Sequence, residues 1–434
     1  MDQDLFHIFM DFIYNFFENI ILLQNLVPTV CLSAAIGYIF YWIFMKDYNF
    51  AEDFAAHGFE HLDKNGLTKD ANKSSNSYKT YKINQLMKRR KIGNIPPHYP
   101  TGWFSILDSD SLKSGEVKEI NVLGENLVAW RGMESDQVHV ADAYCPHNGA
   151  HLGVGGTVRG DCIQCPFHHW RYRGGDGKLV EIPYAERKGA FSIHLKMWES
   201  MEANGNIYIW HDSDEKKSSW SIDIVPYIQN KRWKSCGKTE FEIACHIQEI
   251  IENGADIAHL DPLHGYSFSL GGWNILKTIY EAEWSQADKE TMGGHVAVAK
   301  VGTDICFFNR WKFFRTDLTM YIIGPGIVQF NFDTMFGSGV MIQATTPIEP
   351  LLCLIRHQFY VSNIFLRPLG KLLLYLDKNQ IAADISVWNR KQFLNKPRLA
   401  REDKFIPLFR RWYGQFYPER SLPNGNIQDK RSDF

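Results

Sequence analysis

The sequence predicts an α+β protein in three parts: an apolar N-terminal helix, a small all-β domain, and a larger domain built on an antiparallel sheet with helices. Three observations support this prediction. Residues 19–45 contain no charged side chain. Residues 96–212 contain short runs of alternating apolar and polar side chains, and residues 213–434 contain longer runs of this kind followed by a helical pattern. A long uncharged stretch is typical of a membrane helix, and alternation is typical of half-buried strands.

The composition argues against some classes of protein. The chain has 434 residues, of which 45% are hydrophobic and 22% charged, and its formal net charge is −2. This length accommodates two or three domains with sizeable cores, and the charge gives no indication of a nucleic-acid partner. The eight cysteines are spread along the chain, which favours a reducing compartment over a disulfide-stabilised secreted fold.

Residues 19–45 are expected to anchor the chain in a membrane, after an N-terminal segment of residues 1–18. The stretch is long enough to cross the ~30 Å hydrocarbon core of a bilayer. Residues 1–18 contain no Lys or Arg, whereas residues 64–91 contain seven Lys and two Arg against one Asp. Because positive charge stays in the cytosol, the body should face the cytosol. A cleaved signal peptide would have a basic start and a shorter apolar run. Whether residues 5–17 also enter the membrane stays open.

Residues 46–95 are polar and basic, and we expect them to form a linker between the anchor and the body. The small β domain should follow this linker. In the second domain, the run IVQFNFDT places Val328, Phe330 and Phe332 on one face of a strand. Residues 368–394 are a candidate for a long helix. We therefore expect an antiparallel sheet with helices on one side.

The stretch CPHNGAHLGVGGTVRGDCIQCPFHHW, residues 145–170, contains three cysteines and four histidines. Its glycines superficially resemble a nucleotide-binding loop, but no buried strand precedes them and no helix follows. Cys162 and Cys165 form a C-x-x-C pair, but a redox dithiol normally lies at a helix N-terminus beside a βαβ pattern. Turns and short strands surround this pair instead. Both interpretations are therefore weak.

Metal binding explains the same stretch better. Cys145-x-His147 and Cys165-x-x-His168 each pair one thiol with one imidazole. A Cys₂His₂ set suits tetrahedral zinc, but zinc fingers usually pair Cys with Cys and His with His. Mixed pairs arise in a Rieske [2Fe–2S] cluster, where two cysteines hold one iron and two histidines hold the other.

CPHNGAHL and CPFHHW resemble the signature of the Rieske non-haem iron oxygenases. The resemblance implies that Cys145 and Cys165 bind one iron of a [2Fe–2S] cluster and that His147 and His168 bind the other. It leaves Cys162 and His151 as structural residues or as residues that support the ligands. Because neutral imidazoles replace anionic thiolates, such a cluster is easier to reduce than one held by four cysteines.

A second set of possible metal ligands lies in NGADIAHLDPLH, residues 253–264. On an intact helix His259 and His264 would lie about 140° apart, but Pro262 should break the helix and allow them to converge. Asp256 precedes His259 by three residues, on the same helical face. Taken alone, this pattern does not decide between a metal site and two incidental histidines.

The same stretch resembles the mononuclear iron motif of these oxygenases. The resemblance implies that His259 and His264 bind Fe(II) and that the third ligand is an Asp in a C-terminal helix. The run AADISVWNRK points to Asp384, with Asp377, seven residues earlier, as the alternative. Two histidines and one carboxylate leave iron positions open for O₂ and water.

The resemblance covers about residues 95–400. Together with the anchor, it is closest to the animal, Neverland-type cholesterol 7-desaturases and weaker to the ketosteroid 9α-hydroxylases. It implies a helix-grip-like catalytic domain and a sterol substrate, with cholesterol converted to 7-dehydrocholesterol for steroid hormone synthesis. It also implies O₂, and electrons that come from NAD(P)H through a separate reductase. With the anchor, we expect a single-pass protein of the endoplasmic reticulum membrane with its catalytic body in the cytosol.

The resemblance further implies a homotrimer. In it, His147 or His168 of one chain approaches Asp256 of its neighbour, and Asp256 carries electrons to His259. On the sequence alone, three other functions stay open: a sterol or steroid hydroxylase of the same family, a Rieske electron carrier without its own catalysis, and a zinc-stabilised lipid-binding module. The electron carrier would leave the mononuclear site without a role.

Overall fold

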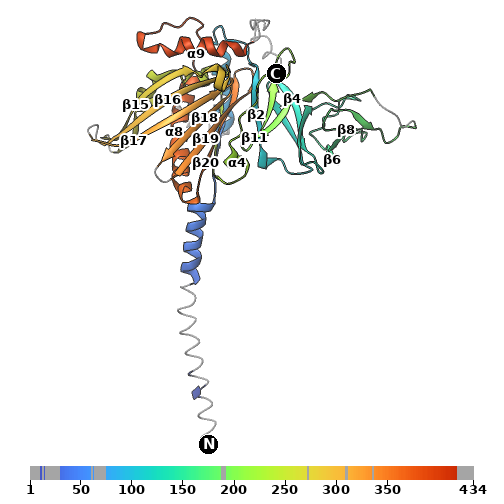
Figure 1. The fold of residues 1–434 in the computed structure, drawn as a ribbon, viewed down its shortest axis with the longest axis horizontal. Coiled ribbons are helices and arrows are strands. Elements are labelled where there is room, and N and C mark those ends of the chain that lie inside the picture. The colour runs from blue at the N-terminus through green and yellow to red at the C-terminus, as the bar shows by residue number, and fades with distance from the viewer. Residues whose placement is uncertain are drawn as a thin grey trace, which may run out of the picture.

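Within the part of the chain that the structure describes, a nine-stranded sheet forms one domain of this computed structural model and three smaller sheets form the other (Figure 1). The described residues are 10–11, 14, 30–59, 62, 75–186, 192–270, 273–307, 311–334 and 337–417. A helix near the N-terminus projects away from both domains (Figure 1). The predicted α+β class, with a small β domain before a sheet-rich domain, is confirmed.

The nine-stranded sheet has the order β1-β13-β20-β19-β18-β17-β16-β15-β14. All neighbours are antiparallel except β1 and β13, which run parallel at one edge. The strands are β1 Tyr48–Glu52, β13 Lys234–Ile243, β14 Tyr266–Leu270, β15 Trp273–Gln286, β16 Val296–Phe307, β17 Trp311–Ile323, β18 Ile327–Thr334, β19 Gly337–Glu349 and β20 Leu352–Val361.

Helices cover one face of this sheet, as the sequence predicts. The long helix α8 packs on β13 and β20, and Trp284 of β15 packs on Phe409 and Trp412 of α9. The α-helices are α3 Ser75–Arg89, α4 Pro226–Gln229, α5 Ile247–Glu252, α6 Leu260–His264, α7 Lys289–Met292, α8 Arg367–Trp388 and α9 Phe405–Tyr413. Short 3₁₀ turns are η2 Ser109–Ser111, η3 Ile257–His259, η4 Ile364–Leu366, η5 Arg401–Asp403 and η6 Gly414–Phe416.

The small domain consists of three sheets with the orders β10-β5-β4-β3, β11-β12-β2 and β6-β7-β8-β9. Two-residue turns join β3 to β4, β6 to β7 and β11 to β12. The turn between β11 and β12 is Asn204-Gly205, with φ angles of 50° and 79°, and positive φ at both positions suits the twist of a hairpin. The strands are β2 Gly102–Asp108, β3 Val117–Val122, β4 Glu125–Arg131, β5 Val138–Asp142, β6 Thr157–Arg159, β7 Cys162–Gln164, β8 Arg171–Arg173, β9 Leu179–Glu181, β10 Met197–Trp198, β11 Ser200–Ala203 and β12 Asn206–His211.

The small domain packs on one face of the nine-stranded sheet, and α8 packs on the other. Strand β20 shows this arrangement, because its adjacent residues point to opposite faces of the sheet. On one face, Arg356 Nε lies 3.3 Å from Asp108 of β2 and 2.6 Å from Glu240 of β13. On the other face, His357 Nδ1 lies 2.5 Å from Asp377 of α8. The sheet therefore lies between the helix that carries Asp384 and the small domain.

The structure differs from the expected linker at residues 46–95. Residues 48–52 form β1, which pairs with β13, and residues 75–89 form α3. Ile83 of α3 is buried, and the Arg90 guanidinium donates to the carbonyl oxygens of Ala244 and Lys391. This segment is polar on average but contains a few apolar side chains that pack against the body. Strand β1 pairs with β13, which lies far away in the sequence. Local pattern could not reveal either contact.

The predicted anchor at residues 19–45 is only partly described. Residues 30–40 are helical and continue into the π-helix η1, Tyr41–Met45. Residues 19–29 lie outside the described residues. Among the residues that are described, no helix combines the length and the apolar character needed to span a membrane.

Candidate functional site

Two loops of the small domain hold Cys145 and Cys165, and the same pair of backbone hydrogen bonds closes each loop. Cys145 N donates to Ala150 O at 2.9 Å, and Gly149 N donates to Cys145 O at 2.9 Å. In the second loop, Cys165 N donates to Trp170 O at 2.8 Å and His169 N donates to Cys165 O at 3.1 Å. Both thiols are buried and interact with each other.

The histidines of the two loops lie nearer the surface than the thiols. The rings of His147 and His168 are 4.6 Å apart between centroids, and His147 stacks on Trp170 at 4.2 Å. The Nδ1 atom of His168 is buried and has no hydrogen-bond partner among the described residues. An unpaired buried nitrogen of this kind is ready to bind a metal.

Two further residues show how this site is built. The hydroxyl of Tyr172 on β8 lies 3.1 Å from Cys145 Sγ, and burial raises the pKa of Tyr172. Cys162 lies on β7, opposite Arg159 and Arg173 of the neighbouring strands, and burial likewise raises its pKa. The buried thiol pair, the two imidazoles and the unpaired nitrogen fit a Rieske cluster. Cys145 and Cys165 would hold one iron, and His147 and His168 the other.

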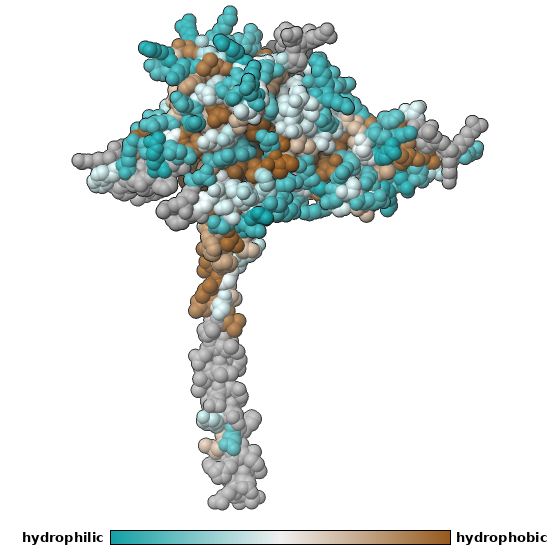
Figure 2. Space-filling view, in the orientation of Figure 1, coloured by the Kyte–Doolittle hydropathy of each residue, from teal (hydrophilic) through white to brown (hydrophobic). Residues whose placement is uncertain are grey.

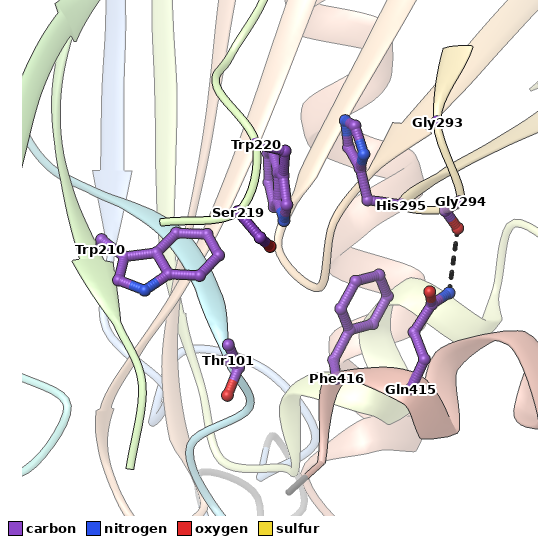
Figure 3. Close-up of a pocket in the computed structure, with 9 residues that line it drawn as sticks. All are labelled: Thr101, Trp210, Ser219, Trp220, Gly293, Gly294, His295, Gln415 and Phe416. Atoms are coloured by element: carbon purple, nitrogen blue, oxygen red, sulfur yellow. Dashed lines mark hydrogen bonds between the residues drawn. The ribbon is translucent and has the colours of Figure 1, made fainter. Parts of the chain in front are cut away.

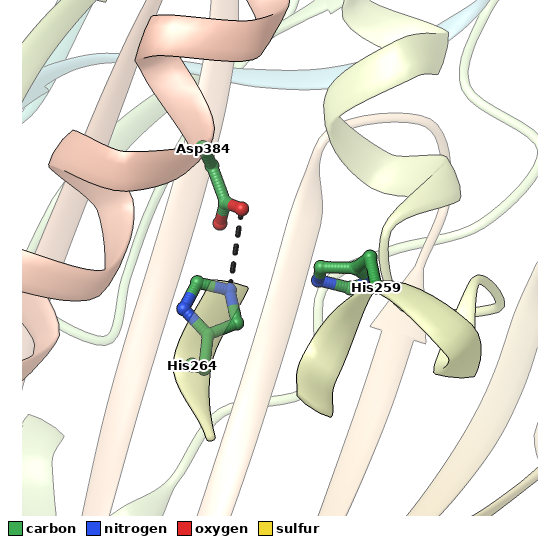
Figure 4. Close-up of side chains that lie close together, drawn as sticks. All are labelled: His259, His264 and Asp384. Atoms are coloured by element: carbon green, nitrogen blue, oxygen red, sulfur yellow. Dashed lines mark ion pairs between the residues drawn. The ribbon is translucent and has the colours of Figure 1, made fainter. Parts of the chain in front are cut away.

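In the catalytic domain, His259, His264 and Asp384 converge, and each offers a ligand atom within 4.8 Å of the others (Figure 4). His264 Nε2 lies 3.2 Å from Asp384 Oδ1, and the two histidine rings are 5.4 Å apart and nearly perpendicular. His264 Nδ1 is buried without a hydrogen-bond partner among the described residues, and Asp384 Oδ1, also buried, faces His264 Nε2. This donor set fits a mononuclear Fe(II) with open positions.

The local helix geometry positions His259. Its Nδ1 donates to the backbone carbonyl of Asp256, and its Nε2 lies 3.4 Å from the Asn253 amide nitrogen. Because the proton on Nδ1 is donated to this carbonyl, Nε2 is unprotonated and has the lone pair that a metal requires. Pro262 does not break the helix. It lies in the first turn of α6, where proline is tolerated, and the chain instead changes from 3₁₀ to α geometry directly after His259.

Asp377 lies two turns before Asp384 on α8 and has a different partner. Its Oδ2 lies 2.5 Å from His357 Nδ1, and His357 Nε2 lies 3.1 Å from Gln343 Oε1. Asp377 is therefore hydrogen-bonded within a polar network between α8 and the sheet. It does not belong to the group formed by His259, His264 and Asp384.

The predicted electron transfer through Asp256 needs a second chain, so it stays a prediction. Within one chain, the described contact of Asp256 with His259 is made by its backbone carbonyl. The Asp256 side chain is partly exposed.

A hollow of about 400 Å³ lies elsewhere in the structure (Figure 3). In its lining, Trp220 stacks on His295 at 4.3 Å, and Gln415 Nε2 donates to O of the adjacent Gly294 at 3.1 Å. None of the residues that line it belongs to either metal set, and we assign it no role.

Sequence reasoning missed Tyr172 and His246. Tyr172 is an ordinary strand residue in the sequence, and only the folding of β8 brings it to Cys145. His246 is the N-cap of α5, the helix that leads to Asn253, and it accepts a hydrogen bond from Gln248 N. Histidine is an uncommon N-cap residue. The sequence therefore had no Ser, Thr, Asp or Asn at position 246 that would indicate the start of this helix.

Comparison with known proteins extends this picture. The family model for the Rieske [2Fe-2S] domain matches residues 102–199, and that for the 3-ketosteroid 9alpha-hydroxylase C-terminal domain matches residues 209–417. Cholesterol 7-desaturase nvd 1 of Ciona intestinalis is 36% identical over 92% of this chain and 85% of its own length. Cholesterol 7-desaturase nvd of Drosophila melanogaster is 36% identical over 94% and 97%. A probable 3-ketosteroid-9-alpha-monooxygenase oxygenase component of Rhodococcus rhodochrous is 28% identical over 75% and 82%.

Solved structures agree on the fold. Dicamba monooxygenase with non-heme iron and dicamba superposes with a TM-score of 0.54 at 15% identity, covering 73% of this chain and 97% of that one. NdmA of Pseudomonas putida CBB5 gives a TM-score of 0.51 at 16% identity, covering 73% and 89%. Because the two cholesterol 7-desaturases match more than nine-tenths of the chain, this protein belongs to the cholesterol 7-desaturase family of Rieske oxygenases; it is an oxidoreductase with a Rieske [2Fe–2S] domain, and His259, His264 and Asp384 fit a mononuclear non-haem iron.

Proposed function

We propose that this enzyme converts cholesterol to 7-dehydrocholesterol. The observation that carries the proposal is the convergence of His259, His264 and Asp384 in a chain that matches curated cholesterol 7-desaturases over more than nine-tenths of its length. The sterol loses two hydrogens, O₂ is reduced to two water molecules, and NAD(P)H supplies the remaining two electrons through a separate reductase.

The residues of this chain hold and orient the reacting groups. When bound, the cluster supplies single electrons and the mononuclear iron supplies the chemistry of O₂. His259, His264 and Asp384 would bind the mononuclear iron, and the Asp256 carbonyl fixes the orientation of the His259 ring. The Asn253 amide nitrogen lies 3.4 Å from Nε2 of that ring, where it limits how the imidazole can turn.

The sheet face that carries α8 suits an apolar substrate. Met320, Phe330, Met341 and Phe359 lie opposite one another on neighbouring strands of this face. Met320 and Phe330 are only partly buried, so they present apolar surface beside the core. Sterols are almost entirely apolar, and apolar walls of this kind are typical of their sites.

We also propose that residues 19–45 anchor the enzyme in the endoplasmic reticulum membrane, with the body in the cytosol. The described part of this stretch supports the proposal, because its large apolar side chains, such as those of Ile36, Tyr38 and Trp42, are exposed. Cholesterol partitions into bilayers, so an anchored enzyme is held where its substrate is concentrated.

The enzyme is further proposed to act as a head-to-tail homotrimer in which electrons pass from the cluster of one chain to Asp256 of the next. Two observations support this arrangement. His147 is exposed at the tip of its loop, and Asp256 is partly exposed beside His259. A carboxylate can accept hydrogen bonds from two imidazoles at once.

The function is tested by mass spectrometry of the sterol product. The full chain is supplied with cholesterol in vesicles, O₂, NAD(P)H and a matched reductase, and His259→Ala is the control. Loss of two hydrogens from the sterol is expected, with no change in the control. Gain of one oxygen would instead show a hydroxylase, which the match to the ketosteroid hydroxylase C-terminal domain favours as the second candidate. Reduction of the cluster without any sterol product would show an electron carrier.

A further inference from the structure

Helix α8 carries an exposed apolar stripe where a soluble helix would carry polar side chains. The side chains of Phe365, Leu369, Leu372 and Leu376 are 78%, 42%, 51% and 38% exposed. Their spacing of four, three and four residues places them on one helical face, beginning in the turn before α8. Leu374 of the same helix is fully buried, so α8 presents apolar side chains both to the core and to its outside.

The stripe begins where α8 is joined to the end of the N-terminal helix. Arg367 Nη1 donates to Phe44 O at 2.5 Å and to Met45 O at 2.7 Å. Lys371 Nζ donates to Trp42 O and Ile43 O, both at 2.8 Å. The last carbonyls of a helix have no partner within the helix, so these two cations satisfy and hold its C-terminal end.

These contacts place the stripe beside the last turn of the N-terminal helix. The rings of Phe44 and Phe365 are 6.4 Å apart, and Leu372 follows directly after Lys371. Figure 2 shows that apolar surface extends along the described part of the N-terminal helix, residues 30–45, to the point where it meets the body.

The C-terminal end of the N-terminal helix, from Tyr38 to Lys46, has the composition of a membrane–water boundary. Lys46 Nζ lies 3.4 Å from the centre of the Trp42 ring, and the Tyr38 ring lies 6.0 Å from that of Trp42. Trp, Tyr and Lys gather at the level of lipid headgroups because each combines an apolar body with a polar tip. The boundary therefore falls at the level of Phe365, Leu369 and Leu372.

We propose that Phe365, Leu369 and Leu372 form a second membrane contact, which inserts into the headgroup region of the same phospholipid bilayer as the anchor. This inference rests on the proposed anchor. With two contacts joined through Arg367 and Lys371, the body cannot turn freely about the anchor, and α8, the helix of Asp384, is held against the bilayer that contains the substrate.

Photo-crosslinking of the full chain in phosphatidylcholine vesicles tests this contact. The photoreactive amino acid benzoylphenylalanine is placed singly at Leu372, at Ile36 as a probe of the anchor, and at Leu408 as a matched control. Leu408 is 45% exposed, close to the 51% of Leu372, but it lies on α9, at the end of the body away from the N-terminal helix (Figure 1). Adducts are identified by mass spectrometry.

Phospholipid adducts at Leu372 and Ile36, and none at Leu408, are the expected result. Adducts at Ile36 but not at Leu372 would overturn the second contact and leave the anchor standing. Lipid adducts at neither position would overturn both. Adducts between Leu372 and a second protein chain would show that the stripe is a subunit interface.

A double variant and a matched control measure the effect of this membrane contact on turnover. Leu369→Glu combined with Leu372→Glu should lower turnover of cholesterol in vesicles severalfold and leave turnover of cholesterol delivered by cyclodextrin unchanged. Leu408→Glu should change neither rate. Equal losses with both forms of substrate would show a folding defect in place of a lost membrane contact, and an unchanged rate on vesicles would overturn the proposed consequence.

Discussion

Asp384 and Asp377 share one helix but bind different partners, and this difference can be measured. Asp384→Ala should remove the mononuclear iron and abolish sterol turnover, because Asp384 supplies the one carboxylate of the converging set and is buried beside His264. Asp377→Asn should retain iron and turnover, since the amide oxygen still accepts from His357 Nδ1. Metal analysis should show one iron per chain fewer in Asp384→Ala, while the electron paramagnetic resonance signal of the reduced cluster remains. Loss of that iron from Asp377→Asn instead would move the third ligand to Asp377.

The Tyr172 hydroxyl should tune the cluster. It lies 3.1 Å from Cys145 Sγ, and a hydrogen bond to a ligand sulfur stabilises the more negative, reduced state. Tyr172→Phe should therefore lower the reduction potential of the cluster and leave its iron content unchanged. A redox titration followed by spectroscopy measures the shift. Tyr144→Phe is the control, because Tyr144 is exposed and meets the His151 ring edge-on; an equal shift in both variants would contradict the role of Tyr172.

At the scale of elements, the cap of α5 should make stability depend on pH. Burial lowers the pKa of His246 from its ordinary value of 6.5 to about 4. Neutral His246 accepts from Gln248 N through Nδ1 and donates to Pro97 O through Nε2, and protonation would remove the acceptor. The unfolded chain binds this proton first as pH falls, so stability present above pH 6.5 is lost between pH 6.5 and about 4, by up to roughly 3 kcal/mol.

Thermal unfolding of His246→Asn checks this prediction. Asparagine can cap the helix but does not titrate, so the variant should lose less of its melting temperature between pH 7 and pH 5 than the wild-type chain. An identical pH dependence in the two proteins would remove His246 as the source.

The elements also show what the sequence could and could not predict. The two ligand motifs are local, so Cys145, His147, Cys165 and His168 could be named from a short stretch. Asp384 lies far along the chain from the iron histidines, and only the resemblance to a family pointed to it. Strand β1 was missed because its pairing with β13 joins segments far apart in sequence, which periodicity within a short window cannot detect.

At the scale of the whole molecule, electron transfer between chains can be tested by mixing subunits. Cys145→Ser lacks the cluster and His259→Ala lacks the mononuclear iron, so each variant alone should be inactive. Co-expressed and purified as mixed oligomers, they should recover partial turnover, because an intact cluster then faces an intact iron site across a subunit boundary. Oxygen uptake with sterol measures the recovery.

Asp256→Asn added to the Cys145→Ser chain should abolish this recovery while the mononuclear iron stays bound. That chain contributes the intact iron site to the mixed oligomer, so the substitution removes only the proposed carboxylate link. Verified mixed oligomers without any recovery would instead confine electron transfer to one chain.

The matching hydrogen bonds that close the two cluster loops have a consequence for the maturation of the enzyme. Each of the four bonds joins backbone atoms of a single loop, so the chain itself supplies both the donor and the acceptor. Small zinc domains, in contrast, fold only when their metal arrives. The newly synthesised chain should therefore fold first and present both loops as a finished acceptor to the machinery that builds iron–sulfur clusters. When iron is scarce, the cell would hold a reserve of folded, inactive enzyme that can be loaded without new synthesis.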